Sequence, residues 1–106
     1  MGRLVYENSV KTTYDDRALA HLQLAILAKL RFGEPFALTW KDDASIGGGR
    51  TTVWLHTQTN LVFKYETPQR PLINRAWVHA LTVTANSPSG LYLVHEPSPA
   101  STAAVA

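Results

Sequence analysis

Apolar and polar positions along the chain follow two different periods. Residues 3 to 6 and 10 to 14 are short runs rich in β-branched and aromatic side chains, and three polar residues separate them. This pattern is typical of a β-hairpin. From residue 17 the pattern changes to alanines and leucines, which are strong helix formers, so a helix is predicted to run from there to about residue 32.

The predicted helix carries residues that suit its two ends. Asp15 and Asp16 precede it, where the helix dipole is positive, and Gly33 can close it in the left-handed conformation. At about 100° per residue its large apolar side chains form a broad stripe, while the other side is mostly alanine. Such a helix is expected to be covered on more than one side, by the sheet and by a second helix or a partner subunit. The stripe consists of Leu19, Leu22, Ile26 and Leu30, widened by Leu24 and Leu27, and the other side of Ala18, His21, Ala25 and Ala28.

Three further strand candidates follow at residues 35–41, 50–57 and 60–66. The gap between the last two is short enough for a tight turn, which predicts that they pair antiparallel. Pro71 then stands at a favourable first position for a second helix that ends near residue 85. One face of that helix is expected to be buried and consists of Ile73, Ala76, Trp77, Ala80, Leu81 and Thr84.

A last strand is predicted at residues 91–95, and the small side chains of residues 98–106 indicate a disordered tail. The predicted order is therefore β-β-α-β-β-β-α-β over residues 1–97. We expect one α+β domain, with a mostly antiparallel sheet of five to six strands and two helices packed on one face.

The composition narrows the class of protein. With 106 residues, 45% of them hydrophobic and 17% charged, the chain suits one globular domain. Its net charge is only +2, so any binding of an anionic partner would need a local cationic patch. It contains no cysteine, which excludes disulfides and thiolate sites. No apolar run has the length of a membrane span or a signal peptide, so we expect a soluble cytoplasmic protein without a membrane partner.

The stretch Asp42 to Gly49, which contains three consecutive glycines, invites comparison with a phosphate-binding loop. Such a loop requires the spacing G-x-x-x-x-G-K-[S/T] followed by a helix, whereas this stretch is followed by a strand pattern. The stretch is therefore predicted to be a mobile turn between two strands, in which the glycines relieve backbone strain. Because loops often carry contacts, Ser45, Ile46 and Thr51 are candidate partner contacts, with Ile46 at the exposed tip.

No assembled catalytic set is recognisable. The four histidines lack the spacing of a metal site, and no G-x-S-x-G nucleophile motif occurs. Asp15 and Asp16 are better explained as helix caps than as a catalytic pair. We therefore predict no catalytic residues, no metal and no cofactor.

Alternation in the strands places cationic and aromatic residues on the sheet face away from the helices. Candidate contacts to nucleic acid or to a protein partner on that face are Lys41, Arg50, Trp54, His56 and Lys64. Bases stack on rings while cations neutralise phosphates, which is how single-stranded nucleic acids are bound. The alternative for Trp54 is packing in the core or in a subunit interface, which we favour, as we do core positions for Trp40 and Trp77. Gln23 is expected to satisfy a buried backbone group.

Several pieces of the sequence resemble a group of small actinobacterial proteins of uncharacterised function. The pieces are M-G-R-L-V-Y, D-D-R-A-L-A-H-L-Q, L-T-W-K-D-D-A-S with G-G-R-T-T-V-W-L-H, and N-R-A-W-V-H-A-L, and the resemblance covers residues 1 to about 97. Members of that group are often labelled ATP-dependent DNA ligases. The label implies a lysine–AMP adduct formed through a K-x-D-G motif. Here the nearest match, which begins at Lys41, has Ala44 in place of the glycine.

Three functions follow from these patterns, in order of preference. The first is a non-catalytic interaction module that self-associates through the open sheet face or through the alanine side of the first helix. The second is a nucleic-acid-associated module that uses the cationic and aromatic face. The third is a nucleotidyl transferase with Lys41 as the nucleophile.

Overall fold

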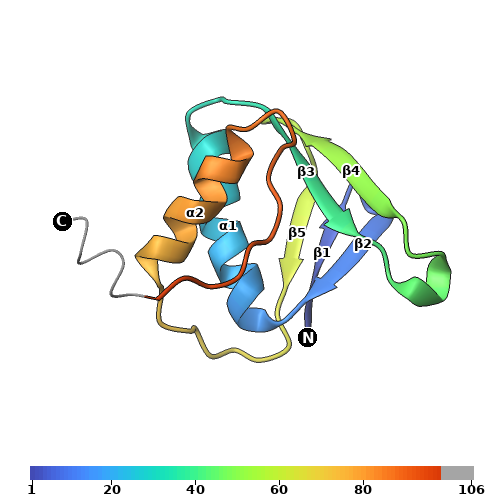
Figure 1. The fold of residues 1–106 in the computed structure, drawn as a ribbon, viewed down its shortest axis with the longest axis horizontal. Coiled ribbons are helices and arrows are strands. Elements are labelled where there is room, and N and C mark those ends of the chain that lie inside the picture. Colours follow the sequence, from blue (N-terminus) through green and yellow to red (C-terminus); the bar gives the residue numbers. More distant parts are fainter. Residues whose placement is uncertain (99–106) are drawn as a thin grey trace.

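The computed structural model describes residues 1–98, except for the side chain of Ile46. The chain forms one α+β domain in which two helices cover one side of the strands (Figure 1). Five strands make two antiparallel sheets, with the orders β2-β1-β5 and β3-β4. The elements are β1 (Gly2–Tyr6), β2 (Val10–Tyr14), α1 (Asp16–Arg31), β3 (Phe36–Lys41), the short 3-10 helix η1 (Ala44–Ile46), β4 (Arg50–Leu55), β5 (Leu61–Lys64) and α2 (Arg75–Ala85). Apart from Ser98, the predicted disordered tail lies outside the described residues.

The first hairpin is confirmed. Strands β1 and β2 pair antiparallel, with Tyr6 opposite Val10. Glu7 and Asn8 turn the chain with φ angles of 52° and 62°. Two consecutive left-handed residues match the right-handed twist of the flanking strands, which explains the tight connection.

The predicted pairing of β4 with β5 is wrong. Strand β5 pairs instead with β1, with Leu61 opposite Tyr6, while β4 pairs with β3. A tight turn does join β4 to β5, because the amide of Thr59 donates to the carbonyl of His56 at 3.0 Å. The two strands then diverge from that turn and enter different sheets (Figure 1).

The predicted last strand is reduced to a single bridge. Leu91 lies parallel to Leu38, and its carbonyl accepts the amide of Thr39 at 2.9 Å. Residues beyond Leu91 run without regular structure along the helices. The cause lies in their hydrogen bonds, because Glu96 and the carbonyls of Val94 and Pro97 are used by side chains of the helical layer.

The first helix begins and ends as its sequence predicts. The Asp15 carboxylate accepts the amide of Ala18 at 2.7 Å, and Gly33 follows the helix with φ of 70°. The helix is covered on two sides, because α1 packs against β1 and β2 and also against α2. Its alanine side, with His21 and Ala25, is therefore buried inside the domain. The predicted widening of the apolar stripe is wrong at Leu24, which is 42% exposed.

The second helix starts later than Pro71. Asn74 is its cap, since the side-chain oxygen accepts the amide of Ala76 at 3.0 Å. Ile73 consequently lies outside the helix and is exposed, whereas Trp77 and Leu81 are buried as predicted. Among residues 1–98, no helix has the length and apolar character needed to cross a membrane.

Candidate nucleic-acid interface

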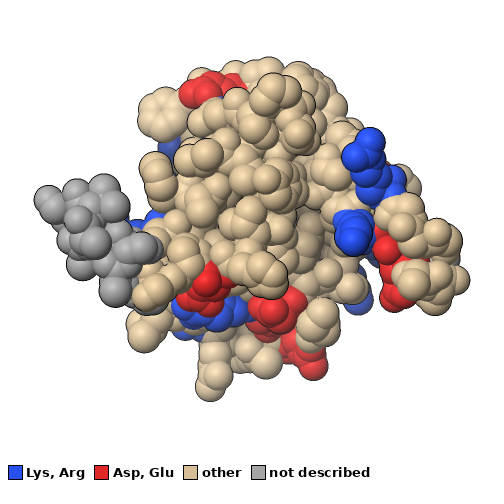
Figure 2. All heavy atoms as spheres, viewed as in Figure 1, with Lys and Arg blue, Asp and Glu red and all other residues tan. Residues whose placement is uncertain are grey.

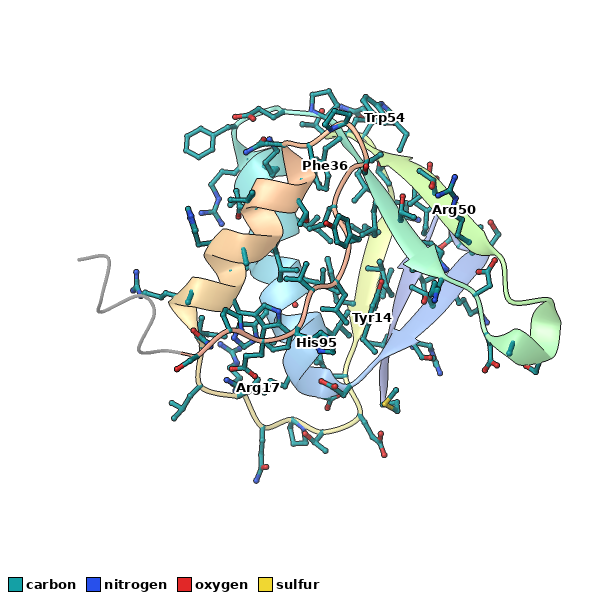
Figure 3. All side chains as sticks on the ribbon, viewed as in Figure 1. Tyr14, Arg17, Phe36, Arg50, Trp54 and His95 are labelled. Carbon is teal, nitrogen blue, oxygen red and sulfur yellow. The ribbon has the colours of Figure 1, made fainter. Side chains whose placement is uncertain are left out.

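The face of the β3–β4 hairpin that points away from the helices is ordered in three rows. In the register of the two strands, Ala37 lies opposite Trp54, Thr39 opposite Thr52, and Lys41 opposite Arg50. The intervening residues, such as Phe36, Leu38 and Leu55, point into the core. Figure 3 shows Arg50 and Trp54 on the same hairpin, both directed away from the helices. We call these three rows the outer hairpin face.

Trp54 supplies an aromatic surface at one end of the outer hairpin face. Trp54 is 55% exposed, so the first part of the favoured interpretation, a core position, is wrong, while its second part, a position in a subunit interface, stays a prediction. Trp40 and Trp77, at 8% and 6% exposure, are core residues as predicted. The difference follows from strand alternation, because Trp40 lies at an inward position of β3 and Trp54 at an outward position of β4.

Lys41 and Arg50 supply positive charge at the opposite end of the face. Both side chains are exposed, and they occupy directly opposite positions of the ladder. Like charges in directly opposite cross-strand positions disfavour folding. The ion pairs among the described residues use Arg17, Lys29 and the amino group of Met1, and neither of these two cations.

The middle row is neutral and polar. The hydroxyls of Thr39 and Thr52 are hydrogen-bonded to each other at 2.8 Å. Four residues along β4 separate Trp54 from Arg50, which corresponds to about 13 Å. The outer hairpin face therefore presents a ring, two hydroxyls and two cations along one strand direction.

His56 and Lys64 do not lie on the outer hairpin face. His56 begins the turn after β4, where its Nδ1 accepts the amide of Gln58 at 3.1 Å. Lys64 belongs to the other sheet, because β5 pairs with β1. There it lies directly opposite Arg3 of β1. Lys11 lies on β2, opposite Val5, and points out of the same face of the sheet. The sequence interpretation missed Arg3 and Lys11, although their alternation with Leu4 and Thr12 signals outward positions.

None of the five strands found within residues 1–98 contains an acidic residue. All five strand cations point outward: Arg3, Lys11, Lys41, Arg50 and Lys64. Figure 2 shows that lysine and arginine side chains gather beside the end of the β3–β4 hairpin, next to the carboxylates of the connecting loop. Half of the ten lysine and arginine residues thus lie on the strands. The strands therefore carry a local excess of positive charge, although the net charge of the whole chain is only +2.

The glycine-containing loop is a turn between two strands, as predicted, and its own hydrogen bonds hold it closed. The amide of Asp42 donates to the carbonyl of Gly49 at 2.7 Å, and Gly47 and Gly48 have φ of 112° and 68°. The Asp42 carboxylate accepts the hydroxyl of Thr51 at 2.9 Å, so Thr51 supports the loop. The backbone amides of this loop therefore close the turn on itself.

Asp43 keeps the loop negatively charged. Its carboxylate accepts the amide of Ser45 at 3.0 Å, and this hydrogen bond holds the pKa of Asp43 below its usual value. The loop therefore carries negative charge next to the strand cations. Ser45 is exposed, while the side chain of Ile46, the proposed contact at the tip, lies outside the described part of the structure.

Two buried polar residues, His21 and Asn74, join the two helices. His21 is fully buried, its Nδ1 donates to the carbonyl of Arg17 at 2.7 Å, and its Nε2 accepts the amide of Asn74 at 2.8 Å. Its ring also lies 4.6 Å from that of Trp77, measured between centroids. Both nitrogens are therefore engaged in holding α2 on α1.

A second polar cluster holds the segment that follows Leu91. The Arg17 guanidinium donates to both oxygens of Glu96, at 2.9 and 2.6 Å, and the Asn74 amide donates to Glu96 at 3.0 Å. The Arg17 guanidinium and, secondarily, the Asn74 amide lower the pKa of Glu96 from 4.5 to about 2. Gln23 accepts the hydroxyl of Tyr65, so the predicted backbone partner of Gln23 is replaced by a tyrosine.

Metal ligands and pockets are the two remaining features that bear on chemistry. Within residues 1–98, no three histidine or carboxylate side chains are grouped closely enough to hold a metal ion. An open groove of about 600 Å³ lies between α1 and the segment 65–73, and Leu24, Tyr65 and Ile73 supply much of its wall. The groove contains no titratable residue other than Tyr65 and Arg70, so it offers no acid–base pair.

Comparisons with known proteins add one finding. Residues 1–96 match the model of a family described as a domain of unknown function, DUF7882. No curated protein and no solved structure matches the chain.

Proposed function

The chain belongs to the DUF7882 family, and we propose that it is a non-catalytic module that binds single-stranded nucleic acid on the outer hairpin face. Trp54 would stack on a base, while Lys41 and Arg50 would neutralise backbone phosphates about 13 Å away. The two threonine hydroxyls between them would face the sugar or phosphate oxygens. The proposal involves no cofactor and no metal.

The observation that carries the proposal is the cross-strand pair of Lys41 and Arg50. Two like charges in opposite positions cost folding stability, and no carboxylate among the described residues forms an ion pair with either of them. An anionic ligand would remove that cost. The exposed ring of Trp54 on the same face makes a base-bearing polyanion a better fit than a simple anion.

The same pair argues against self-association through this face. A two-fold interface centred on the row of Lys41 and Arg50 would place the cations of one copy against those of the other, which is unfavourable unless anions intervene. The alternative route through the alanine side of α1 is covered by α2 within the chain. We therefore rank nucleic-acid binding above self-association.

The resemblance to proteins labelled DNA ligases supports a nucleic-acid partner rather than adenylation. Lys41 is the exposed last residue of a strand, and the carboxylate of the following Asp42 accepts a hydrogen bond from the hydroxyl of Thr51. Its neighbour across the ladder is Arg50, which provides no base to remove its proton. Incubation with labelled ATP is expected to give no protein–AMP adduct, and an adduct that is lost in Lys41→Arg would contradict the proposal.

Fluorescence anisotropy with a labelled oligothymidylate of about 12 nucleotides tests the proposal directly. We expect binding that weakens with salt, and a loss of about tenfold in Trp54→Ala, because stacking on one base contributes roughly 1–3 kcal/mol. The double variant Lys41→Gln/Arg50→Gln should bind more weakly and lower the salt slope by about 1.4, at roughly 0.7 per phosphate contact.

A matched control separates local contacts from net charge. Arg70→Gln/Arg75→Gln also removes two positive charges, but from exposed positions outside the strands. The control should bind as the unmodified protein does, and Lys41→Gln/Arg50→Gln should unfold no more easily, because it relieves a like-charge pair. Equal binding defects in both double variants would reduce the interaction to non-specific charge and refute the proposed site.

A further inference from the structure

The outer edge of strand β2 has no neighbouring strand. In the three-stranded sheet β2 pairs with β1 alone, on the side of β1 away from β5 (Figure 1). A strand at the end of a sheet presents unpaired backbone amides and carbonyls, which can pair with another chain. The edge of β2 is a different surface from the outer hairpin face and from the alanine side of α1.

Hydrogen bonds at the end of the first hairpin show which way the backbone groups of β1 point. The amide of Ser9 donates to the carbonyl of Tyr6 at 3.1 Å, so this carbonyl points toward β2. The next amide, that of Glu7, donates to the carbonyl of Asn60 on the opposite side at 2.8 Å. Backbone groups alternate in direction along a strand, so Leu4, two residues before Tyr6, also bonds toward β2.

This alternation places the backbone groups of Lys11 and Thr13 on the open edge. Leu4 lies opposite Thr12 and forms a hydrogen-bonded pair with it, and the two neighbours of Thr12 bond in the opposite direction. Among residues 1–98, no hydrogen bond reaches the backbone amides and carbonyls of Lys11 and Thr13 from that side. Both residues are exposed.

The edges of the two-stranded sheet are partly occupied. Leu91 lies on the edge of β3, where it forms backbone hydrogen bonds with Ala37 and Thr39. On β4, the carbonyl of Trp54 accepts the hydroxyl of Tyr6 at 3.2 Å. The remaining edge is that of β5, which has 4 residues against 5 in β2.

The sequence of β2 is complementary to itself in one antiparallel register. A two-fold axis at Thr12 places Lys11 of one copy opposite Thr13 of the other, and Val10 opposite Tyr14. Each Lys11–Thr13 pair then exchanges both of its backbone hydrogen bonds, because all of these groups point to the edge. Thr12 lies opposite Thr12 of the second copy, which is a favourable cross-strand pair.

The charges of β2 are compatible with this register. Lysine on an edge strand commonly discourages pairing. Here each Lys11, the only charged residue of the strand, faces a threonine, and the two lysines are diagonal neighbours about 7–8 Å apart. Salt screens their repulsion, so association should strengthen with salt, whereas binding of nucleic acid weakens.

We propose that the protein pairs with a second copy of itself through β2, in an antiparallel contact centred on Thr12. The contact joins the two three-stranded sheets into one continuous sheet in the order β5-β1-β2-β2-β1-β5. A pair of 5-residue strands is smaller than the interface of a stable dimer, so association is weak and depends on protein concentration. The contact involves no residue of the outer hairpin face and does not depend on the proposed function.

Because the sequence contains no cysteine, disulfide trapping can test the register. Thr12→Cys places the only thiol of each chain at the two-fold axis, where the Cα atoms of a non-hydrogen-bonded pair lie about 4.5 Å apart, within reach of a disulfide. Thr13→Cys is the matched control, since the two copies of this more exposed residue would lie about 7–8 Å apart on the diagonal. With oxidised glutathione, Thr12→Cys should form the covalent dimer at least about tenfold faster than Thr13→Cys, and faster still at higher salt.

Thr13→Pro tests the hydrogen bonds of the contact. Its amide points to the open edge, where proline is tolerated, so the substitution removes no bond to β1. Added to Thr12→Cys, it should abolish the faster disulfide formation, while thermal unfolding shows that the domain remains folded. In the unmodified protein, the amides of Lys11 and Thr13 should exchange with deuterium more slowly at high than at low protein concentration.

The outcomes separate this contact from other forms of association. Equal rates for Thr12→Cys and Thr13→Cys, or a rate for Thr12→Cys that Thr13→Pro leaves unchanged, would refute it. Val62→Cys occupies the corresponding central position of β5, and faster dimer formation there would assign the interface to β5 and refute the contact through β2. A failure of oligonucleotide binding would overturn the proposed function and leave these disulfide rates unaffected.

Discussion

Replacing Gly90 by alanine should disconnect the segment after α2 from β3. Gly90 has φ of 83°, and an added Cβ would lie 2.7 Å from the carbonyl oxygen of Ala37. That same oxygen accepts the amide of Leu91 at 2.8 Å, and Leu91 in turn accepts the amide of Thr39. The added methyl group therefore strains the backbone and also pushes apart the contact that aligns Leu91 with Leu38.

The magnitude follows from two separate contributions. A left-handed alanine costs about 1–2 kcal/mol. Loss of two backbone hydrogen bonds adds about 1 kcal/mol each, so Gly90→Ala should lower the free energy of unfolding by roughly 3–4 kcal/mol. Gly33→Ala is the matched control, because Gly33 has φ of 70° but its added Cβ meets no atom within 4 Å. The control should lose only the first contribution, about 1–2 kcal/mol.

Urea unfolding followed by circular dichroism measures both variants on one scale. The difference between them isolates the contact with Ala37 from the backbone conformation. If Gly90→Ala and Gly33→Ala lose the same stability within about 0.5 kcal/mol, the close approach at Gly90 does not hold the segment, and the reasoning is wrong.

Three further predictions concern charge and burial. Burial raises the pKa of Tyr14 from 10.0 to about 12, against a smaller opposing effect of a hydrogen bond to Thr12. The contribution of Tyr14 to the free energy of unfolding should therefore be complete below pH 10 and fall by about 3 kcal/mol as the pH rises to about 12. Tyr14→Phe should abolish that fall in alkaline unfolding experiments. Because the pKa of Glu96 is lowered to about 2, its contribution is complete above pH 4.5 and is lost as pH falls towards 2; Glu96→Gln should differ from the unmodified protein at pH 6 and converge with it near pH 2, and a constant difference would contradict this. Asp43→Asn preserves the hydrogen bond to Ser45 but removes a charge beside the outer hairpin face; it should tighten oligonucleotide binding a few-fold at low salt, roughly as expected for one exposed charge, and weaker binding would show that the loop carboxylate assists the ligand.

Local patterns in the sequence were sufficient for the elements but not for all of their partners. The cap at Asp15, the closure at Gly33 and the inward and outward alternation around Trp40 and Trp54 follow from rules that act over a few residues. Pairing of β5 with β1 depends on contacts between residues about 55 positions apart, such as Tyr6 and Leu61. The sequence of the turn between β4 and β5 does not indicate that these two strands belong to different sheets.

The candidate site shows the same division. Lys41, Arg50 and Trp54 were placed together correctly because one hairpin carries them all. Lys64 was assigned to that face only because β4 and β5 were expected to pair. The role of His21 in joining the helices also depends on Asn74, which is 53 positions away. The capping role of Asn74 was not predicted, because the second helix was expected to start at Pro71.

The three tryptophans differ in exposure, so their intrinsic fluorescence can report separately on the outer hairpin face and on the core. Trp40 and Trp77 are enclosed by the core, whereas Trp54 is open to solvent on the outer hairpin face. A soluble quencher such as acrylamide should therefore remove mainly the emission of Trp54 and leave the two enclosed rings bright. A ligand seated on that face would shield Trp54 from the quencher, so occupancy can be followed in the unlabelled chain while the emission of the two core rings reports, in the same spectrum, that the fold is intact.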